Sequence, residues 1–207
     1  MPPNSPPRAA PGSTVRHHDW EGADVGGGEF TDVTFVGADL SEVTTTGTVF
    51  TGCTFQDVRF NASAHTTTAF INCTFRGAVF FDTLFDDCKL TGSSFDRCRF
   101  ELMRATGGDW SFVSLSRAVL DGTRFERVRM READLTRSRL REAVLAEVDL
   151  SGADLAGADL SGADLRGSAL GSVAGLDLPG TVLRGARITI DQAVVVAEAF
   201  GMDVRAD

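Results

Sequence analysis

The chain has 207 residues, of which 43% are apolar and 24% charged, and its formal net charge is −9. This composition is typical of a globular protein, and no apolar run approaches the ~18 residues of a membrane span. The acidic balance argues against direct nucleic-acid binding, which needs a basic surface. Fifteen phenylalanines stand beside no tyrosine, which indicates interior positions that accept only hydrocarbon.

The N-terminal residues 1–16 hold five of the six prolines and no apolar segment of the kind found in signal peptides. We therefore predict a disordered, proline-rich tail over 1–16. Without a signal peptide or a membrane span, the predicted location is cytoplasmic.

A period of five residues dominates the rest of the chain. From residue 30 to residue 170, every fifth residue is large and apolar except Thr45, His65 and Ala105. The residue two before each is small or β-branched, with Met103 as the exception. Neither a helical nor a strand period fits this spacing.

Such a period requires a chain that turns after every unit, so that one large and one small side chain point to a common axis. Four units then form a square coil of 20 residues, stacked on the next at the ~4.8 Å spacing of strands. The predicted fold is an all-β solenoid. Thr45, His65 and Ala105 fall on one of its four faces, where we expect a local distortion, and Met103 beside Ala105 indicates an exchange of large and small side chains. Glycines such as Gly37, Gly52, Gly92 and Gly122 follow the large residue by two and suit the turns.

The period shifts by three after Leu170, because the next large residues are Leu178, Leu183 and Ile188. We therefore place a short loop at about 171–175 within a repeat domain over 17–188. The remaining segment, 189–207, is predicted to be a C-terminal helix and tail.

Thr189 and Gln192 have the spacing of a capping box, and Gly201 is placed to end the helix. The helix between them is apolar on nearly every side, so one face can cap the last coil while the others need a partner. This pattern predicts a homodimer interface, and the alternative is a helix curled entirely onto its own coil. The predicted interface residues are Val194, Val195, Val196, Ala197, Phe200 and Met202.

Catalytic and metal-binding patterns are weak. Cys53, Cys73, Cys88 and Cys98 all occupy the small inward position, so they are interpreted as core residues, not metal ligands or disulfides. His17, His18 and Asp19 lack further ligands at metal spacing and are interpreted as part of a solvated tail. No nucleophile or phosphate-binding motif is present. We predict neither an enzyme nor any cofactor, metal or small-molecule substrate.

Charge is arranged in three bands. Residues 17–96 hold twelve acids and three bases, 97–141 hold six and eleven, and 142–207 hold eleven and four. The bands thus carry −9, +5 and −7. In the middle band, Arg97, Arg117 and Arg137 are spaced by 20 residues and should stack one above another. They would form either a contact for an acidic partner or a solvated stripe that neighbours such as Glu132 and Asp134 neutralise.

The C-terminal band places one carboxylate on each of four successive faces, at Asp149, Asp154, Asp159 and Asp164. An aspartate before the large residue can also accept backbone N–H bonds that fix the turn. Both interpretations stay open from the sequence.

The run from Ala153 to Leu165 reads Ala-Asp-Leu-x-x and resembles the pentapeptide-repeat family. The resemblance covers residues from about 20 to 190. It implies a right-handed quadrilateral β-helix.

Two further segments, 63–75 and 185–194, are similar to the mycobacterial group of fluoroquinolone-resistance pentapeptide proteins and its actinobacterial relatives. That resemblance implies a dimeric, non-catalytic DNA mimic that binds DNA gyrase and inhibits it or protects it from quinolones. From the charge bands we hypothesise that the acids of the C-terminal band make this contact: Glu142, Glu147, Asp149, Asp154, Asp159 and Asp164.

Two alternatives remain beside this interpretation. One is a structural or interaction scaffold whose protein partner is not a topoisomerase. The other is a self-resistance protein of an antibiotic producer, which shares the gyrase target but counters a different inhibitor. The arginine-rich middle band fits a DNA mimic poorly, so the acidic C-terminal band carries that hypothesis.

Overall fold

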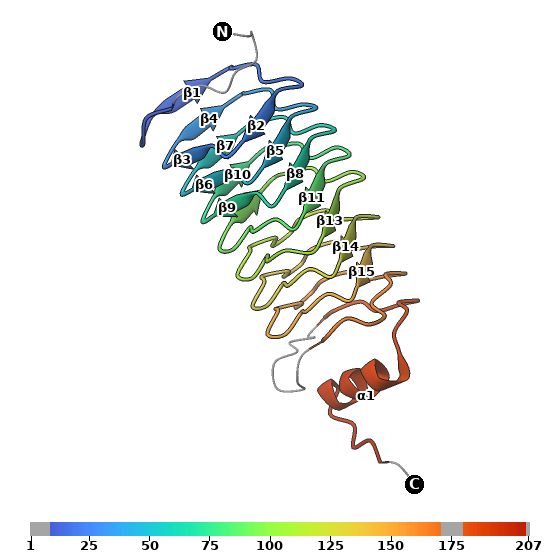
Figure 1. Cartoon of the computed structure of the whole chain (residues 1–207). Helices are drawn as coiled ribbons and strands as arrows, with labels where there is room; N and C mark the ends of the chain where they lie inside the picture. Colours follow the sequence, from blue (N-terminus) through green and yellow to red (C-terminus); the bar gives the residue numbers. More distant parts are fainter. Residues whose placement is uncertain (1–8, 171–179, 206–207) are drawn as a thin grey trace.

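The computed structural model describes residues 9–170 and 180–205. They form a rod of stacked coils with the N-terminus at one end and a single helix at the other (Figure 1). Each coil has four sides, which we number by their central residues. Face 1 carries Val15, Phe35 and every twentieth residue after; face 2 begins at Trp20, face 3 at Val25 and face 4 at Phe30.

Three faces carry parallel sheets whose strands are three residues long. Face 1 has β1 (Thr14–Arg16), β4 (Thr34–Val36), β7 (Thr54–Gln56), β10 (Thr74–Arg76) and β12 (Ser94–Asp96). Face 3 has β2 (Asp24–Gly26), β5 (Thr44–Thr46), β8 (Ala64–Thr66), β11 (Leu84–Asp86), β13 (Arg104–Thr106), β14 (Arg124–Glu126) and β15 (Val144–Ala146). Face 4 has β3 (Glu29–Thr31), β6 (Val49–Thr51) and β9 (Ala69–Ile71). Face 2 and the later coils are joined by single bridges.

Strand register confirms the square coil, because each residue pairs with the one 20 positions later, as Phe35 does with Phe55. The large residues and the small residues two before them fill the axis as one continuous core. Phenylalanine rings stack along it: successive centroids of Phe35, Phe55, Phe75 and Phe95 lie 5.0, 4.8 and 4.7 Å apart. The axis therefore accepts flat rings, and a phenol there would bury a hydroxyl that needs a hydrogen-bond partner.

The turns share one backbone feature. The second residue after each central residue has a positive φ, from His17 to Gly167. Glycine meets this requirement without strain, and the predicted turn glycines all lie here. Many of these positions nevertheless carry side chains, among them Thr67 (φ 47°) and Phe112 (φ 59°). Parallel stacking thus imposes the left-handed conformation even where the residue type disfavours it.

Two predictions were wrong. The coil begins at β1, within the predicted tail, because the five-residue period continues back through Trp20 to Val15; His18 packs edge-on against Trp20, so the segment is not a solvated tail. Residues 1–8 lie outside the described part.

Face 3 is also not distorted at Thr45, His65 and Ala105, since β5, β8 and β13 keep the regular register. Met103 and Ala105 are both buried, as the predicted exchange requires.

The last coil confirms the shift of three residues, since Asp159 pairs with Val182 and Asp164 with Arg187. The predicted loop at 171–175 lies outside the described residues. Helix α1 (Ile190–Ala199) begins with the predicted capping box of Thr189 and Gln192. Gln192 also donates from Nε2 to the carbonyls of Leu165 and Ser168, which fixes the helix on the final coil.

Candidate functional site: the charged surface and the C-terminal helix

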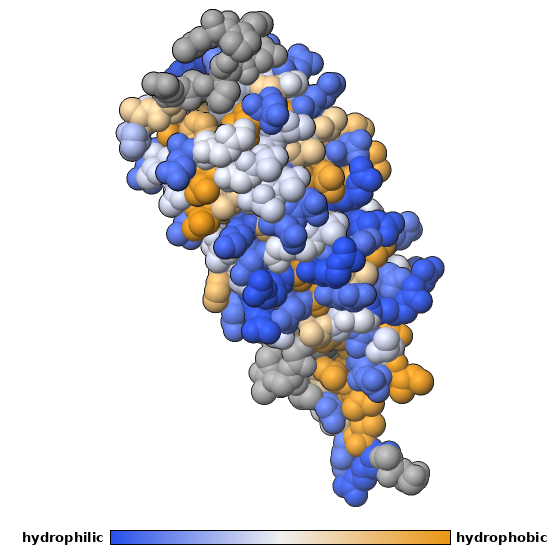
Figure 2. Space-filling model, viewed as in Figure 1, coloured by the Kyte–Doolittle hydropathy of each residue, from blue (hydrophilic) through white to orange (hydrophobic). Residues whose placement is uncertain are grey.

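The arginines of the middle band surround the rod. They lie on faces 2, 3 and 4 and at the corners between faces and, in several cases, reach a carboxylate in an adjacent coil. Arg131 Nε lies 2.5 Å from Asp149 Oδ2, and Arg141 Nε lies 2.6 Å from Asp159 Oδ2. Figure 2 shows hydrophilic side chains gathered over this middle part of the rod. The basic band therefore neutralises part of the acidic band next to it.

The four predicted surface aspartates are engaged in their own turns. Each accepts a hydrogen bond at Oδ1 from the backbone N–H two residues later: Asp149 from Ser151, Asp154 from Ala156, Asp159 from Ser161 and Asp164 from Arg166. The same contact recurs in other coils, as from Thr136 to Asp134. The structural interpretation of these carboxylates is confirmed, and all four are half-buried.

The pKa values of Asp149, Asp159 and Asp164 reflect these contacts. Hydrogen bonds from Ser161 and Arg141 lower the pKa of Asp159 to about 2, and those from Arg166 lower that of Asp164 to about 2. For Asp149, burial alone would raise the pKa, but the hydrogen bonds from Ser151 and Arg131 outweigh it. These three aspartates stay ionised, and their carboxylates already bind N–H groups, hydroxyls and arginines of the same chain.

Glu142 and Glu147 behave differently. Both are exposed at turn positions with φ of 56°, and no cation among the described residues lies within ion-pair distance of either. Glu142 lies at the corner after face 2 and Glu147 at the corner after face 3. Of the six candidate acids, these two present the most available charge to a partner.

The arginines predicted to stack, Arg97, Arg117 and Arg137, lie in three successive coils at the corner after face 1. Arg97 donates to Asp96 at 3.2 Å, but Arg117 and Arg137 have no ion pair with a described residue, so the suggested neutralisation by Glu132 and Asp134 does not occur. Arg97 and Arg117 line an open pocket of about 540 Å³ between their coils.

The C-terminal helix leaves apolar surface uncovered. Among the predicted interface residues, Val195 and Val196 pack partly against the final coil, Val194 and Ala197 are half-buried, and Phe200 and Met202 are 57% and 61% exposed. The sequence reasoning missed Ile190, which is 86% exposed, and Val204. Ile190 is the first residue of the helix, so the apolar pattern of the residues that follow it did not single it out.

The predicted core role of the cysteines fits their geometry. All four cysteines are free thiols, of which Cys53, Cys73 and Cys88 are buried and Cys98 is half-buried. Each donates to a backbone carbonyl in the coil before, as Cys88 Sγ does to the carbonyl of His65 at 3.2 Å. Thr48, Thr83, Ser93 and Ser168 make the same contact from the same inward position. No three His, Cys, Asp or Glu side chains in the described ranges are grouped to hold a metal ion. No helix within those ranges is long and apolar enough to cross a membrane.

Comparison with known families decides what this architecture is. A model of pentapeptide repeats matches three overlapping segments, residues 104–137, 111–145 and 133–170. The rod is a pentapeptide-repeat solenoid. Residues 25–100 also match a model of the SV2A/B/C luminal domain. A search of curated proteins finds no match.

Solved structures confirm the pentapeptide-repeat fold over nearly the whole chain. A trypsin-treated variant of QnrB1, described as a plasmid-mediated fluoroquinolone resistance protein, is 22% identical and superposes with a TM-score of 0.66, covering 94% of this chain and 96% of that one. A second trypsin-treated variant gives a TM-score of 0.64 at the same identity and coverage. These similarities establish the fold of the rod.

Proposed function

We propose that this protein is a non-catalytic DNA mimic that binds DNA gyrase and inhibits it or protects it from fluoroquinolones. The observation that carries the proposal is the match of 94% of the chain to QnrB1, a fluoroquinolone resistance protein, at a TM-score of 0.66. The identity of 22% relates the folds, so the gyrase target remains an inference from that likeness and from the surface.

The exposed carboxylates support this proposal. Duplex DNA carries one negative charge per ~1.7 Å, and a narrow rod that displays carboxylates can compete for a cleft built to hold it. Glu142 and Glu147 are the best-placed contacts, whereas Asp149, Asp154, Asp159 and Asp164 contribute mainly through the local field. We assign the gyrase contact to the C-terminal third of the rod.

Dimerisation through the C-terminal helix would extend this surface. Apolar side chains exposed at the end of the rod are Ile190, Phe200, Met202 and Val204. Exposed apolar groups gathered at one end favour association with a second copy by a closed two-fold contact. Two rods joined in this way would place both acidic bands next to the dimer axis.

The decisive experiment is a supercoiling and DNA-cleavage assay with gyrase from the organism that carries this gene, with and without a fluoroquinolone. We expect the protein to inhibit supercoiling or to reduce drug-stabilised cleavage. The double variant Glu142→Arg/Glu147→Arg should lose that effect. Glu42→Arg is the matched control, because Glu42 lies at the same corner with nearly the same backbone (φ 57°) in the N-terminal band. No effect of the wild-type protein on gyrase would overturn the proposal.

Reversal of Asp154, Asp159 and Asp164 to arginine is a poor test of gyrase binding. Each carboxylate accepts a backbone hydrogen bond in its turn, so its replacement disturbs the coil as well as the charge. Glu142 and Glu147 accept no such bond, and their variants separate the two effects.

The second candidate is a scaffold with a partner other than a topoisomerase, and the band of arginines favours it. A pull-down with purified gyrase subunits at increasing salt distinguishes the two. A DNA mimic should lose gyrase binding steeply as salt increases. A scaffold should show no gyrase binding at any salt concentration.

A further inference from the structure

Backbone pairing along face 2 is lost between two adjacent coils. Along face 2, adjacent coils normally share three backbone hydrogen bonds, such as Arg99 to Ala78, Phe80 to Arg99 and Asp82 to Glu101, at 3.0, 2.8 and 2.9 Å. Between the coils centred on Phe100 and Leu120 none of the three forms. The N–H groups of Val119, Phe100 and Leu102 have no backbone acceptor there, although these residues lie within the described part of the chain.

The preceding corner shows the same interruption. Arg97 N–H should donate to Ser116 by analogy with Gly77, which donates to Asp96 at 2.9 Å, but it does not. The turn changes type here: Ala118 N–H donates to Leu115 at 3.0 Å, whereas the turn at Arg97 lacks the equivalent bond. The loss of pairing along face 2 therefore begins at a corner where the two coils have turns of different type.

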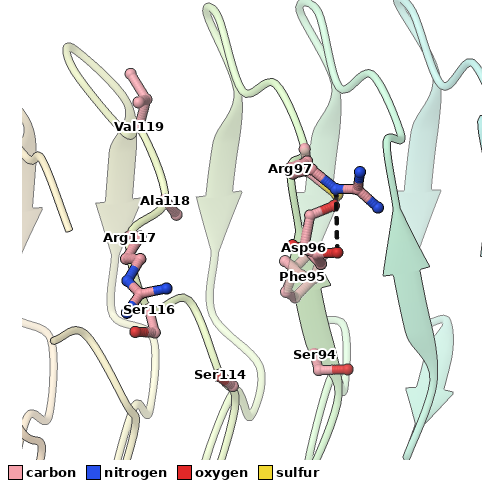
Figure 3. Close-up of a pocket in the computed structure, with 10 residues that line it drawn as sticks. Ser94, Phe95, Asp96, Arg97, Ser114, Ser116, Arg117, Ala118 and Val119 are labelled. Atoms are coloured by element: carbon pink, nitrogen blue, oxygen red, sulfur yellow. Dashed lines mark hydrogen bonds and ion pairs between the residues drawn. The ribbon is translucent and has the colours of Figure 1, made fainter. Parts of the chain in front are cut away.

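A groove follows this interruption. At its start lies the 540 Å³ pocket, whose two sides are Ser94 to Cys98 on one coil and Ser114 to Val119 on the next (Figure 3). At its other end a second pocket, of about 340 Å³, is lined by Asp82, Leu102, Met103, Arg104, Gly122 and Arg124. The two pockets thus lie at the two ends of face 2, with the unpaired backbone groups between them, and we call these three parts together the groove.

The chemistry of the groove is specific. Leu102 and Val119 are 60% and 47% exposed, although they lie on a rod whose other outward residues are mostly polar. Arg97 and Arg117 lie at one end, and Arg104 and Arg124 at the other. Arg104 and Arg124 have carboxylates at 3.0 and 3.2 Å, but Arg117 has none among the described residues. Backbone donors and acceptors, apolar contacts and cations therefore occur together.

We propose that this groove binds an extended, acidic segment of a protein partner. The segment's backbone would pair with the free N–H groups of Phe100, Leu102 and Val119 and with the C=O groups that lack a donor, those of Cys98, Val119 and Asp121, as in β-strand addition. Apolar side chains in its middle would contact Leu102 and Val119, and acidic side chains towards its ends would meet the arginines. The net charge of +5 over residues 97–141 selects an acidic segment over a basic one.

A fluorescein-labelled peptide of alternating glutamate and valine provides the first test, with fluorescence anisotropy as the readout and a lysine-valine peptide for comparison. We expect saturable binding of the acidic peptide alone. Leu102→Gly should weaken it about fivefold and Arg97→Gln/Arg117→Gln about tenfold. Glycine suits the φ of 60° at Leu102, so the first variant keeps the coil folded.

The matched controls are Phe112→Gly and Arg127→Gln. Phe112 is 62% exposed with φ 59°, and Arg127 has φ 56°, but neither lines the groove. Both variants should bind the peptide as the wild type does. In hydrogen exchange, the amides of Phe100, Leu102 and Val119 should exchange quickly in the free protein and slowly with the peptide bound.

Three results would overturn this proposal: no saturable binding, equal binding by a glutamate-serine peptide, or binding that the groove variants leave unchanged. The second would show that the arginines attract any polyanion. Because the assay contains no gyrase, its outcome is independent of the supercoiling experiment.

Discussion

His65 is the most unusual residue of the core, a titratable side chain on the axis of the rod with none of its surface exposed. Its Nδ1 lies 2.8 Å from Thr45 Oγ1, its Nε2 lies 3.1 Å from Ser63 Oγ, and its ring stacks on Phe85 with centroids 5.1 Å apart. Burial lowers its pKa to about 3, so the imidazole is neutral at physiological pH.

This shift makes stability depend on pH. Below the unfolded pKa of ~6.5 the unfolded chain binds a proton that the folded chain does not, so stability decreases as pH falls from 6.5 towards 3. We expect His65→Phe to remove that dependence and to gain about 2.5 kcal/mol relative to the wild type between pH 7 and pH 4.5. Urea denaturation of both proteins at the two pH values measures it.

The substitution keeps the neighbouring hydroxyls bonded, because Thr45 also contacts Thr68 and Ser63 donates to Phe60. Equal loss of stability on acidification in the two proteins would contradict the buried neutral imidazole. In that case the carboxylates alone would determine the acid response.

Gly108 shows how strictly the coils constrain an element. It occupies the small inward position before Trp110, and a Cβ there would lie 2.0 Å from the backbone oxygen of Cys88 in the coil below. Its φ of +80° adds a second constraint. The close approach of these two coils thus depends on a residue without a side chain.

We expect Gly108→Ala to destabilise the protein by about 3 kcal/mol, because the backbone of two coils must move apart. Gly122→Ala is the control: it has φ +66° but nothing within 4 Å of the added Cβ, so it should cost only about 1 kcal/mol. Chemical denaturation compares the two variants. Equal losses would show that the positive φ, and not the contact with Cys88, makes glycine necessary.

The five-residue period was sufficient to predict the coil, its inward residues, the shift by three before Leu183 and the capped helix, because each follows from which side chains must reach the axis. The turn interruption beside Arg97 could not be predicted in this way. The residues at the Arg97 and Arg117 turns satisfy the same five-residue period. The two turns differ in one backbone hydrogen bond, from Ala118 to Leu115, which the pattern of apolar residues does not reveal. The first coil begins at Val15, earlier than predicted, because the five prolines of residues 1–16 indicated disorder although Val15 and Trp20 fit the five-residue period.

Ion pairing across coils explains why charge was harder to predict from sequence. A sum over residues 142–207 counts Asp149 and Asp159 as free acids, although arginines 18 positions earlier neutralise them. These pairs join residues that are close only once the coils have stacked. Of the six candidate acids, Glu142 and Glu147 are the two that the rod leaves exposed without an ion pair to a described residue.

The end of the rod determines its predicted assembly. We expect the protein to be a dimer of twice 22.0 kDa in light scattering, and Phe200→Asp/Met202→Asp to be a monomer with the same circular dichroism spectrum, because two charges would enter the apolar contact. Phe112→Asp, on the side of the rod, should stay dimeric. A wild-type protein that is monomeric at tens of micromolar would contradict the interface.

The interrupted face also affects how the molecule unfolds. In a stack where each coil touches only its neighbours, cooperativity is transmitted through the interfaces between them, and the weakest interface limits it. The coils of Phe100 and Leu120 share fewer hydrogen bonds than the pairs on either side. The rod should therefore unfold as two blocks, one rich in phenylalanine and one rich in leucine, with separate transitions in denaturant-dependent hydrogen exchange; a single transition for all amides would contradict this.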